Sequence, residues 1–165
     1  MRGLHESTHG SRRLRHTPRS HATCRVNSLR KLILRLDAAF LSLAGILGVL
    51  TALMSYTSGS GPFRDTFQGN PTVAGAVETH ALAILVAALL WYFSQQRRMT
   101  PGNWIGLFAH LVMGGGNILW FGLFMRVQAE TLGIAVTALH LLFAALHLGL
   151  LVRREGRRAE SLSFR

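Results

Sequence analysis

Four histidines in the apolar part of the chain are the side chains best suited to chemistry. His140 and His147 stand seven residues apart in the run HLLFAALHL, so in a helix they lie on one face, two turns apart. His80 and His110 occupy two other apolar stretches. An imidazole can exchange protons near neutral pH and can ligate metals or haem iron. Ionisable side chains inside apolar segments therefore indicate a functional site.

Small and polar residues recur at helical spacing in each of the four apolar stretches. Helices in a bilayer associate through small residues and hydrogen bonds, because lipid is as apolar as leucine. We therefore predict a bundle with a small, polar interior, in which Leu, Ile, Val and Phe face lipid. The four faces are Asp37, Leu41, Ala44, Gly48, Thr51 and Ser55; His80, Ala83, Ala87 and Trp91; Asn103, Gly106, His110, Gly114 and Asn117; and Gly133, Thr137, His140, Ala144 and His147.

Depth along each helix, at ~1.5 Å per residue, sorts these groups into two levels. Asp37, His110 and His147 fall toward the cytoplasmic end. A second group falls nearer the outer end and comprises Glu78, His80, Asn117 and His140. We expect a polar path or cavity that joins the two levels along the HLLFAALH stripe. The predicted ligand-binding or proton-binding residues are Glu78, His80, Asn117, His140 and His147.

A haem b site is an alternative use of the same histidines. His110 and His147 lie at matching depth, as bis-histidine ligation requires, and small residues beside them would admit the macrocycle. One haem at most is expected, and no c-type attachment, because C-x-x-C-H is absent. The wall of either kind of cavity is predicted to comprise Gly106, Gly114, Gly115, Gly116 and Ala144.

A metal site is not predicted. Zinc bound by His110 and His147 would need a third ligand such as Asp37. Asp37 borders its uncharged stretch, so we expect its side chain to reach the membrane interface instead.

Hydrolytic chemistry has no support in the sequence, which lacks a nucleophile elbow and the H-E-x-x-H motif. We expect no catalytic residues and favour a non-enzymatic protein. Three functions stay open. The first is the binding or conduction of a small lipophilic ligand or protons, the second is a b-type cytochrome, and the third is an accessory or assembly subunit of a membrane complex.

Composition and charge distribution favour a membrane protein. Hydrophobic residues make up 49% of the 165 residues and charged residues only 15%, where a soluble domain has about a quarter. The net charge of +11 is concentrated at the two ends, which argues against a basic nucleic-acid-binding surface. Uncharged stretches cover residues 38–63, 79–96, 99–125 and 131–152. Each approaches or exceeds the ~20 residues that a helix needs to cross a bilayer.

These stretches predict an all-α fold, a four-helix transmembrane bundle with spans near 34–56, 76–95, 103–126 and 132–152. Basic residues cluster in the 1–31 tail, at Arg97 and Arg98, and after residue 152. By the positive-inside rule, both termini are then cytoplasmic and the bilayer is the cell membrane. We expect residues 1–31 to be a disordered basic tail, 32–152 the membrane domain and 153–165 a second basic tail. The bundle could act alone, as a homo-oligomer or within a larger complex.

Overall fold

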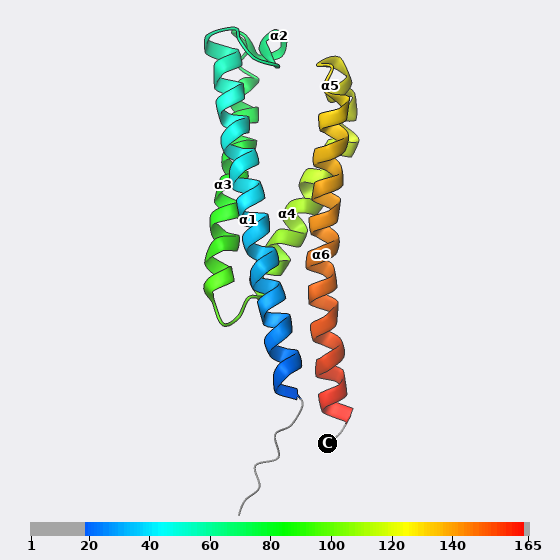
Figure 1. Ribbon diagram of the computed structural model, residues 1–165. Helices are drawn as coiled ribbons and strands as arrows, with labels where there is room; N and C mark the ends of the chain where they lie inside the picture. Colours follow the sequence, from blue (N-terminus) through cyan, green and yellow to red (C-terminus); the bar gives the residue numbers. More distant parts are fainter. Residues whose placement is uncertain (1–18, 164–165) are drawn as a thin grey trace, which may run out of the picture.

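The computed structural model describes residues 19–163, and side chains are described for residues 26–153. This part of the chain is helical and contains no strand. Three long helices lie roughly parallel, and a fourth crosses obliquely between them (Figure 1). The helices are α1 (Arg19–Thr57), α2 (Arg64–Phe67), α3 (Val73–Gln95), α4 (Thr100–Leu119), α5 (Phe121–Arg126) and α6 (Glu130–Ser163).

Three of the helices are long and apolar enough to cross a membrane. These are the Val26–Thr57 part of α1, all of α3, and the Glu130–Arg153 part of α6. Large aliphatic side chains on each are left exposed, including Leu43 on α1, Leu85 on α3 and Ile134 on α6. Exposed aliphatic surface on every long helix is typical of contact with lipid. The predicted membrane character of the chain is therefore confirmed at this level.

The segment predicted as the third span differs from the others. In place of one helix over residues 103–126, α4 ends at Leu119, and the short α5 follows after a break at Trp120. Helix α4 is less apolar than the three candidate spans, because it contains polar residues and three consecutive glycines. Its 20 residues are nevertheless long enough, at ~1.5 Å each, to match the hydrocarbon thickness of a bilayer.

The first and last long helices extend further toward the chain ends than the sequence predicts. Helix α1 begins at Arg19, within the tail expected to be disordered, and α6 continues to Ser163, beyond the predicted end of the last span. No glycine or proline interrupts residues 19–31, so nothing in that segment stops the helix from extending. The part of the predicted tail before Arg19 lies outside the described residues.

Packing divides the molecule into two helix pairs, α1 with α3 and α4 with α6. Between α1 and α3, Leu34, Ala38, Leu41, Ala87 and Leu90 form a buried core. The two pairs are joined in the half of the molecule where α4 begins (Figure 1). There the guanidinium of Arg30 on α1 donates to the carbonyl oxygen of Leu150 on α6 at 2.6 Å.

Candidate functional site

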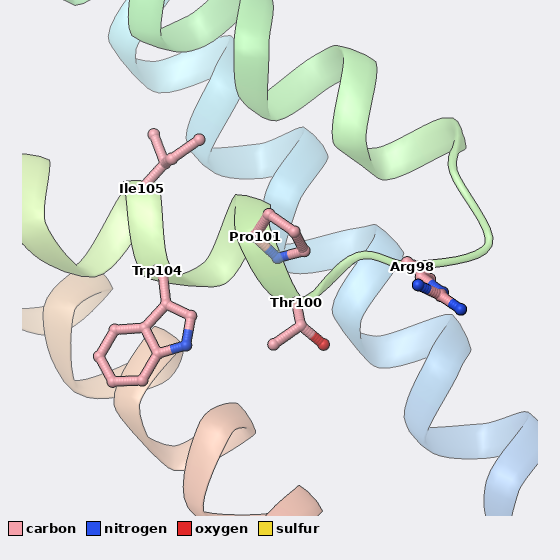
Figure 2. Close-up of a pocket in the computed structure, with 5 residues that line it drawn as sticks. All are labelled: Arg98, Thr100, Pro101, Trp104 and Ile105. Atoms are coloured by element: carbon pink, nitrogen blue, oxygen red, sulfur yellow. The ribbon is translucent and has the colours of Figure 1, made fainter.

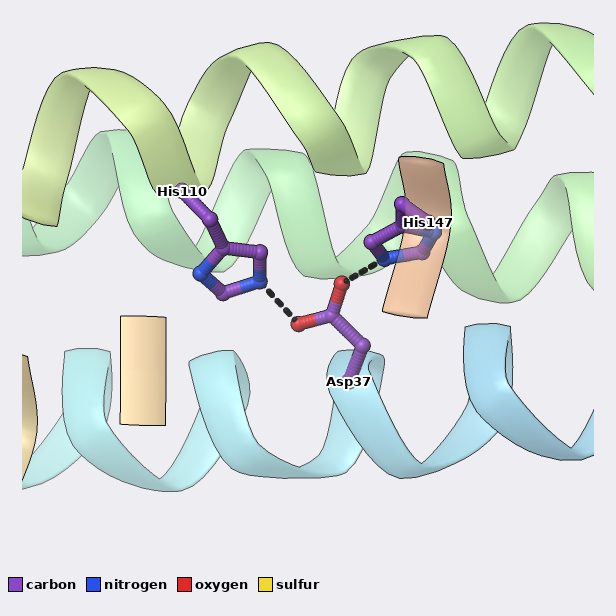
Figure 3. A group of neighbouring side chains, drawn as sticks. All are labelled: Asp37, His110 and His147. Carbon is purple, nitrogen blue, oxygen red and sulfur yellow. Dashed lines mark hydrogen bonds and ion pairs between the residues drawn. The ribbon is translucent and has the colours of Figure 1, made fainter. Parts of the chain in front are cut away.

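Asp37 is the centre of a buried polar cluster that joins three helices. Its Oδ1 lies 2.7 Å from Nε2 of His110 on α4, and its Oδ2 lies 2.7 Å from Nε2 of His147 on α6. All three side chains are completely buried. Figure 3 shows the carboxylate with one oxygen directed at each ring. A carboxylate without water needs such partners, because an unpaired buried charge is strongly destabilising.

The far side of His147 is also fixed. Its Nδ1 lies 3.2 Å from Oδ1 of Asn103. The amide nitrogen of Asn103 donates to the carbonyl oxygen of Met99 at 3.1 Å, which leaves the amide oxygen facing the imidazole. Asn103 is also completely buried. The ring of His147 is therefore held at both nitrogens, by a carboxylate on one side and an amide on the other.

His110 is held in a similar way by a second histidine. Its Nδ1 lies 2.8 Å from Nδ1 of His140 on α6, so one of these nitrogens donates and the other accepts. Phe143 stacks on His110 with ring centroids 5.2 Å apart, and Phe40 stacks on Phe143 at 5.4 Å. These aromatic rings help to exclude water, which strengthens every electrostatic interaction within the cluster.

The pairing follows from matched spacing on two antiparallel helices. Asn103 and His110 are seven residues apart on α4, and His140 and His147 are seven residues apart on α6. Seven residues keep both side chains of a helix on one face. Because the helices run in opposite directions, Asn103 meets His147 and His110 meets His140.

Glycines on α4 make room for the rings. A Cβ added at Gly106 would overlap the imidazole of His147, and one added at Gly114 would lie 3.2 Å from Cβ of His140. Both glycines are buried. Their hydrogen side chains allow the α6 histidines to lie directly against the α4 backbone, as small residues do in other membrane helix pairs.

The position expected for Asp37 was wrong. We predicted a side chain that reaches the membrane interface, but the carboxylate has no exposed surface. The reason is that two histidines from other helices and the packed α1–α3 core enclose this level of α1. Asp37 is therefore in place to act as the third ligand that a metal site with His110 and His147 would need.

The other predicted site residues do not form one group with the cluster. Glu78 is exposed, and Asn117 is half-buried. His80 lies in the α1–α3 interface, where its ring packs against Gly48. Among the described side chains, no hydrogen bond connects these three residues to His140, which instead joins His110. The structure thus brings His140 and His147 together with His110, Asp37 and Asn103.

The predicted cavity wall is mostly packed against protein. Ala144 lies in a small core with Leu107 and Leu151, and Gly116 lies beside the ring of Trp120. Gly115 has no neighbour within 4 Å of an added Cβ. A surface pocket of about 520 Å³ at the start of α4 is lined by other residues (Figure 2), namely Arg98, Thr100, Pro101, Trp104 and Ile105. None of the four membrane histidines lines that pocket.

No protein family model matches the chain, and comparisons with curated proteins and with solved structures also give no match. Its chemistry must therefore be inferred from the side chains themselves. The cluster offers two imidazole nitrogens and a carboxylate from three helices, with nitrogen and oxygen atoms that all lie within 4.8 Å of one another. Such a set can hold a proton or a small cation.

Proposed function

We propose that this chain is a multi-pass protein of the cell membrane that crosses the bilayer four times, with both termini in the cytoplasm. The three apolar helices support membrane insertion. Helix α4 has the length of a span, and its polar residues Asn103 and His110 are buried against other helices. The basic residues at both ends and at Arg97 and Arg98 then fall on one side, in agreement with the positive-inside rule.

Inside this bundle, the Asp37 cluster binds one small ligand. The single observation that carries this proposal is the completely buried Asp37 carboxylate, held at 2.7 Å by two imidazoles from different helices. Ionisable groups are rare inside membrane proteins, because their desolvation is costly, and they commonly mark functional sites. A bundle that needed only stability would be served as well by apolar residues of similar volume.

The geometry favours a ligand smaller than haem. In a bis-histidine site the iron lies between the two Nε2 atoms, and here the carboxylate of Asp37 occupies that place. The rings of His110 and His147 are nearly parallel, 6.2 Å apart between centroids, with an angle of 16°. The residues present therefore do not fit the haem alternative.

Binding is also favoured over proton conduction through the same hydrogen bonds. The chain of contacts runs from His140 through His110 and Asp37 to His147 and ends at Asn103. An amide is not a proton carrier, and the nitrogen of Asn103 is already bonded to a backbone carbonyl. A path with such an end is better suited to holding a ligand than to passing protons.

Native mass spectrometry of the full chain in mild detergent tests this proposal, because it detects a bound species by its mass, whatever its chemical class. We expect a noncovalent species on the wild type that is lost in Asp37→Asn and kept in Asp65→Asn, whose carboxylate is exposed. Wild-type protein that carries no bound species would contradict the proposal. The cluster would then be a packing device, as an accessory or assembly subunit could use.

A further inference from the structure

We infer that the ligand is a divalent first-row transition-metal ion such as Zn²⁺, bound by Nε2 of His110, Nε2 of His147 and the carboxylate of Asp37. This inference rests on the proposed function, since it names the class of ligand for the same site. The sequence indicated no metal site. The inference comes from how the three side chains and their neighbours are arranged.

The donor set matches such an ion. Two imidazole nitrogens and one carboxylate oxygen are ligands that zinc, iron, cobalt and nickel accept, whereas magnesium and calcium prefer oxygen alone. The three residues come from α1, α4 and α6, and each is completely buried. Three protein ligands leave a further position open for water or another small ligand, which is typical of sites that do more than hold a fold together.

The two partners of His147 leave its Nε2 atom free to act as a metal ligand. Its Nδ1 faces the oxygen of Asn103, and its Nε2 faces an oxygen of Asp37, so both neighbours of the ring are acceptors. A neutral imidazole has only one N–H to donate. Either the ring carries two protons and donates to both oxygens, or a metal ion takes the place of the proton between Nε2 and Asp37. A metal ion there lets the neutral ring donate from Nδ1 to Asn103 and use its Nε2 lone pair as a ligand.

His110 is arranged in the same way. Its Nε2 faces Asp37, while its Nδ1 has a separate partner in Nδ1 of His140 at 2.8 Å. Histidines that ligate metals commonly donate their other N–H to an outer acceptor, which fixes the tautomer and the ring orientation. Asn103 and His140 are well placed to be these outer acceptors.

The spacing can accommodate an ion after a small adjustment. Zinc bonds of about 2.1 Å in a tetrahedron place neighbouring ligand atoms about 3.4 Å apart. The two contacts between histidine and Asp37 are now 2.7 Å, so the carboxylate must withdraw from each ring by a fraction of an ångström. Gly106 has no Cβ to close the space beside the inward nitrogen of His147.

Metal analysis with cobalt as a spectroscopic probe tests the inference. The full chain is purified in mild detergent, its zinc content is measured, and chelator-treated protein is titrated with Co²⁺. We expect about one ion per chain and visible Co²⁺ absorption typical of four or five ligands. Both should be lost in Asp37→Asn and in His147→Gln. His80→Gln is the matched control, because it removes a membrane histidine outside the cluster, and it should bind as the wild type does.

A second variant keeps the test decisive if His147→Gln does not fold. His147→Cys in a Cys24→Ser background supplies a thiolate at the same position, and should add a thiolate-to-cobalt charge-transfer band in the near ultraviolet. Absence of that band in folded protein would contradict the assignment of His147.

The outcomes separate the two proposals. A bound organic species without metal leaves the small-ligand proposal standing and overturns the metal inference. Wild-type protein with no bound mass, no zinc and no Co²⁺ spectrum overturns both.

Discussion

Asp37 and His147 are 110 residues apart in the sequence, yet their side chains meet at 2.7 Å without any exposed surface. This contact ties the first long helix of the chain to the last one. We expect Asp37→Asn to lower the free energy of unfolding by about 3–5 kcal/mol, because it removes one partner of a buried ion pair. The change in unfolding free energy is measured by titrating protein in mild detergent with sodium dodecyl sulfate. The exposed Asp65→Asn serves as the control, and an equal loss in both variants would mean that burial of Asp37 is unimportant.

Gly106 and Gly115 allow a matched test of close packing on one helix. Gly106→Ala should destabilise the protein by about 1–3 kcal/mol, because the new methyl group would overlap the ring of His147. Gly115→Ala meets no neighbour within 4 Å and should be neutral or stabilising by up to ~1 kcal/mol through helix propensity. Thermal unfolding, monitored by circular dichroism, compares the stabilities of the two variants. If Gly106→Ala proved as stable as Gly115→Ala, His147 would not lie against this face of α4.

Arg30 provides a second connection between α1 and α6. Arg30→Met should cost about 1.5–3 kcal/mol of unfolding free energy, since a charged guanidinium then no longer donates to the carbonyl of Leu150. Arg64→Met, at an exposed position, should change it by less than about 0.5 kcal/mol. The same detergent unfolding assay measures both, and similar values for the two variants would argue against a structural role for Arg30.

Membrane topology can be tested with cysteine labelling, because Cys24 is the only natural cysteine. An impermeant maleimide should label Cys24 in inverted vesicles but not in intact cells. In a Cys24→Ser background, Ser60→Cys should react in intact cells and Ser161→Cys only in inverted vesicles. Labelling of Ser161→Cys from outside, with wild-type Cys24 labelled only in inverted vesicles, would show an odd number of spans and so contradict the four-span topology.

Haem binding is expected to be absent. Protein expressed with supplementary haem and purified in mild detergent should show no Soret band, because the carboxylate of Asp37 fills the space between the two imidazoles. A Soret band that disappears in His110→Ala and His147→Ala but remains in His80→Ala would restore the cytochrome interpretation.

The sequence was sufficient to identify which face of α4 points inward. The predicted interior face had five residues: Asn103, Gly106, His110 and Gly114 are buried, and Asn117 at its end is half-buried. This success depends only on the helical period and on the tendency of small and polar residues to meet in a bilayer. The location of each long apolar helix was predictable for a similar reason, because the uncharged stretches are close to the length of a span.

Asp37, His110 and His147 were predicted to lie at one level, and their side chains are in contact. The level of His140 could not be predicted, because counting residues along each helix treats the helices as parallel rods. Helix α4 crosses obliquely (Figure 1), so His110 lies within reach of both His140 and His147. His140, which was expected beside Glu78 and His80, therefore contacts His110 in the Asp37 cluster instead. Asn103 was recognised as an interior residue but not as a site residue. The sequence did contain a signal for this contact. Asn103 and His110 are seven residues apart, as are His140 and His147, so two antiparallel helices can pair them.

The position of Asp37 on the first helix also has a consequence for synthesis. During translation α1 enters the bilayer before its partners exist, since His110 follows 73 residues later and His147 follows 110 residues later. Until α6 is made, the nascent chain carries an aspartate with only part of its final coordination. A chain that ends before α6 therefore leaves one oxygen of the Asp37 carboxylate without its imidazole partner, within an apolar segment where an unpaired charge is costly.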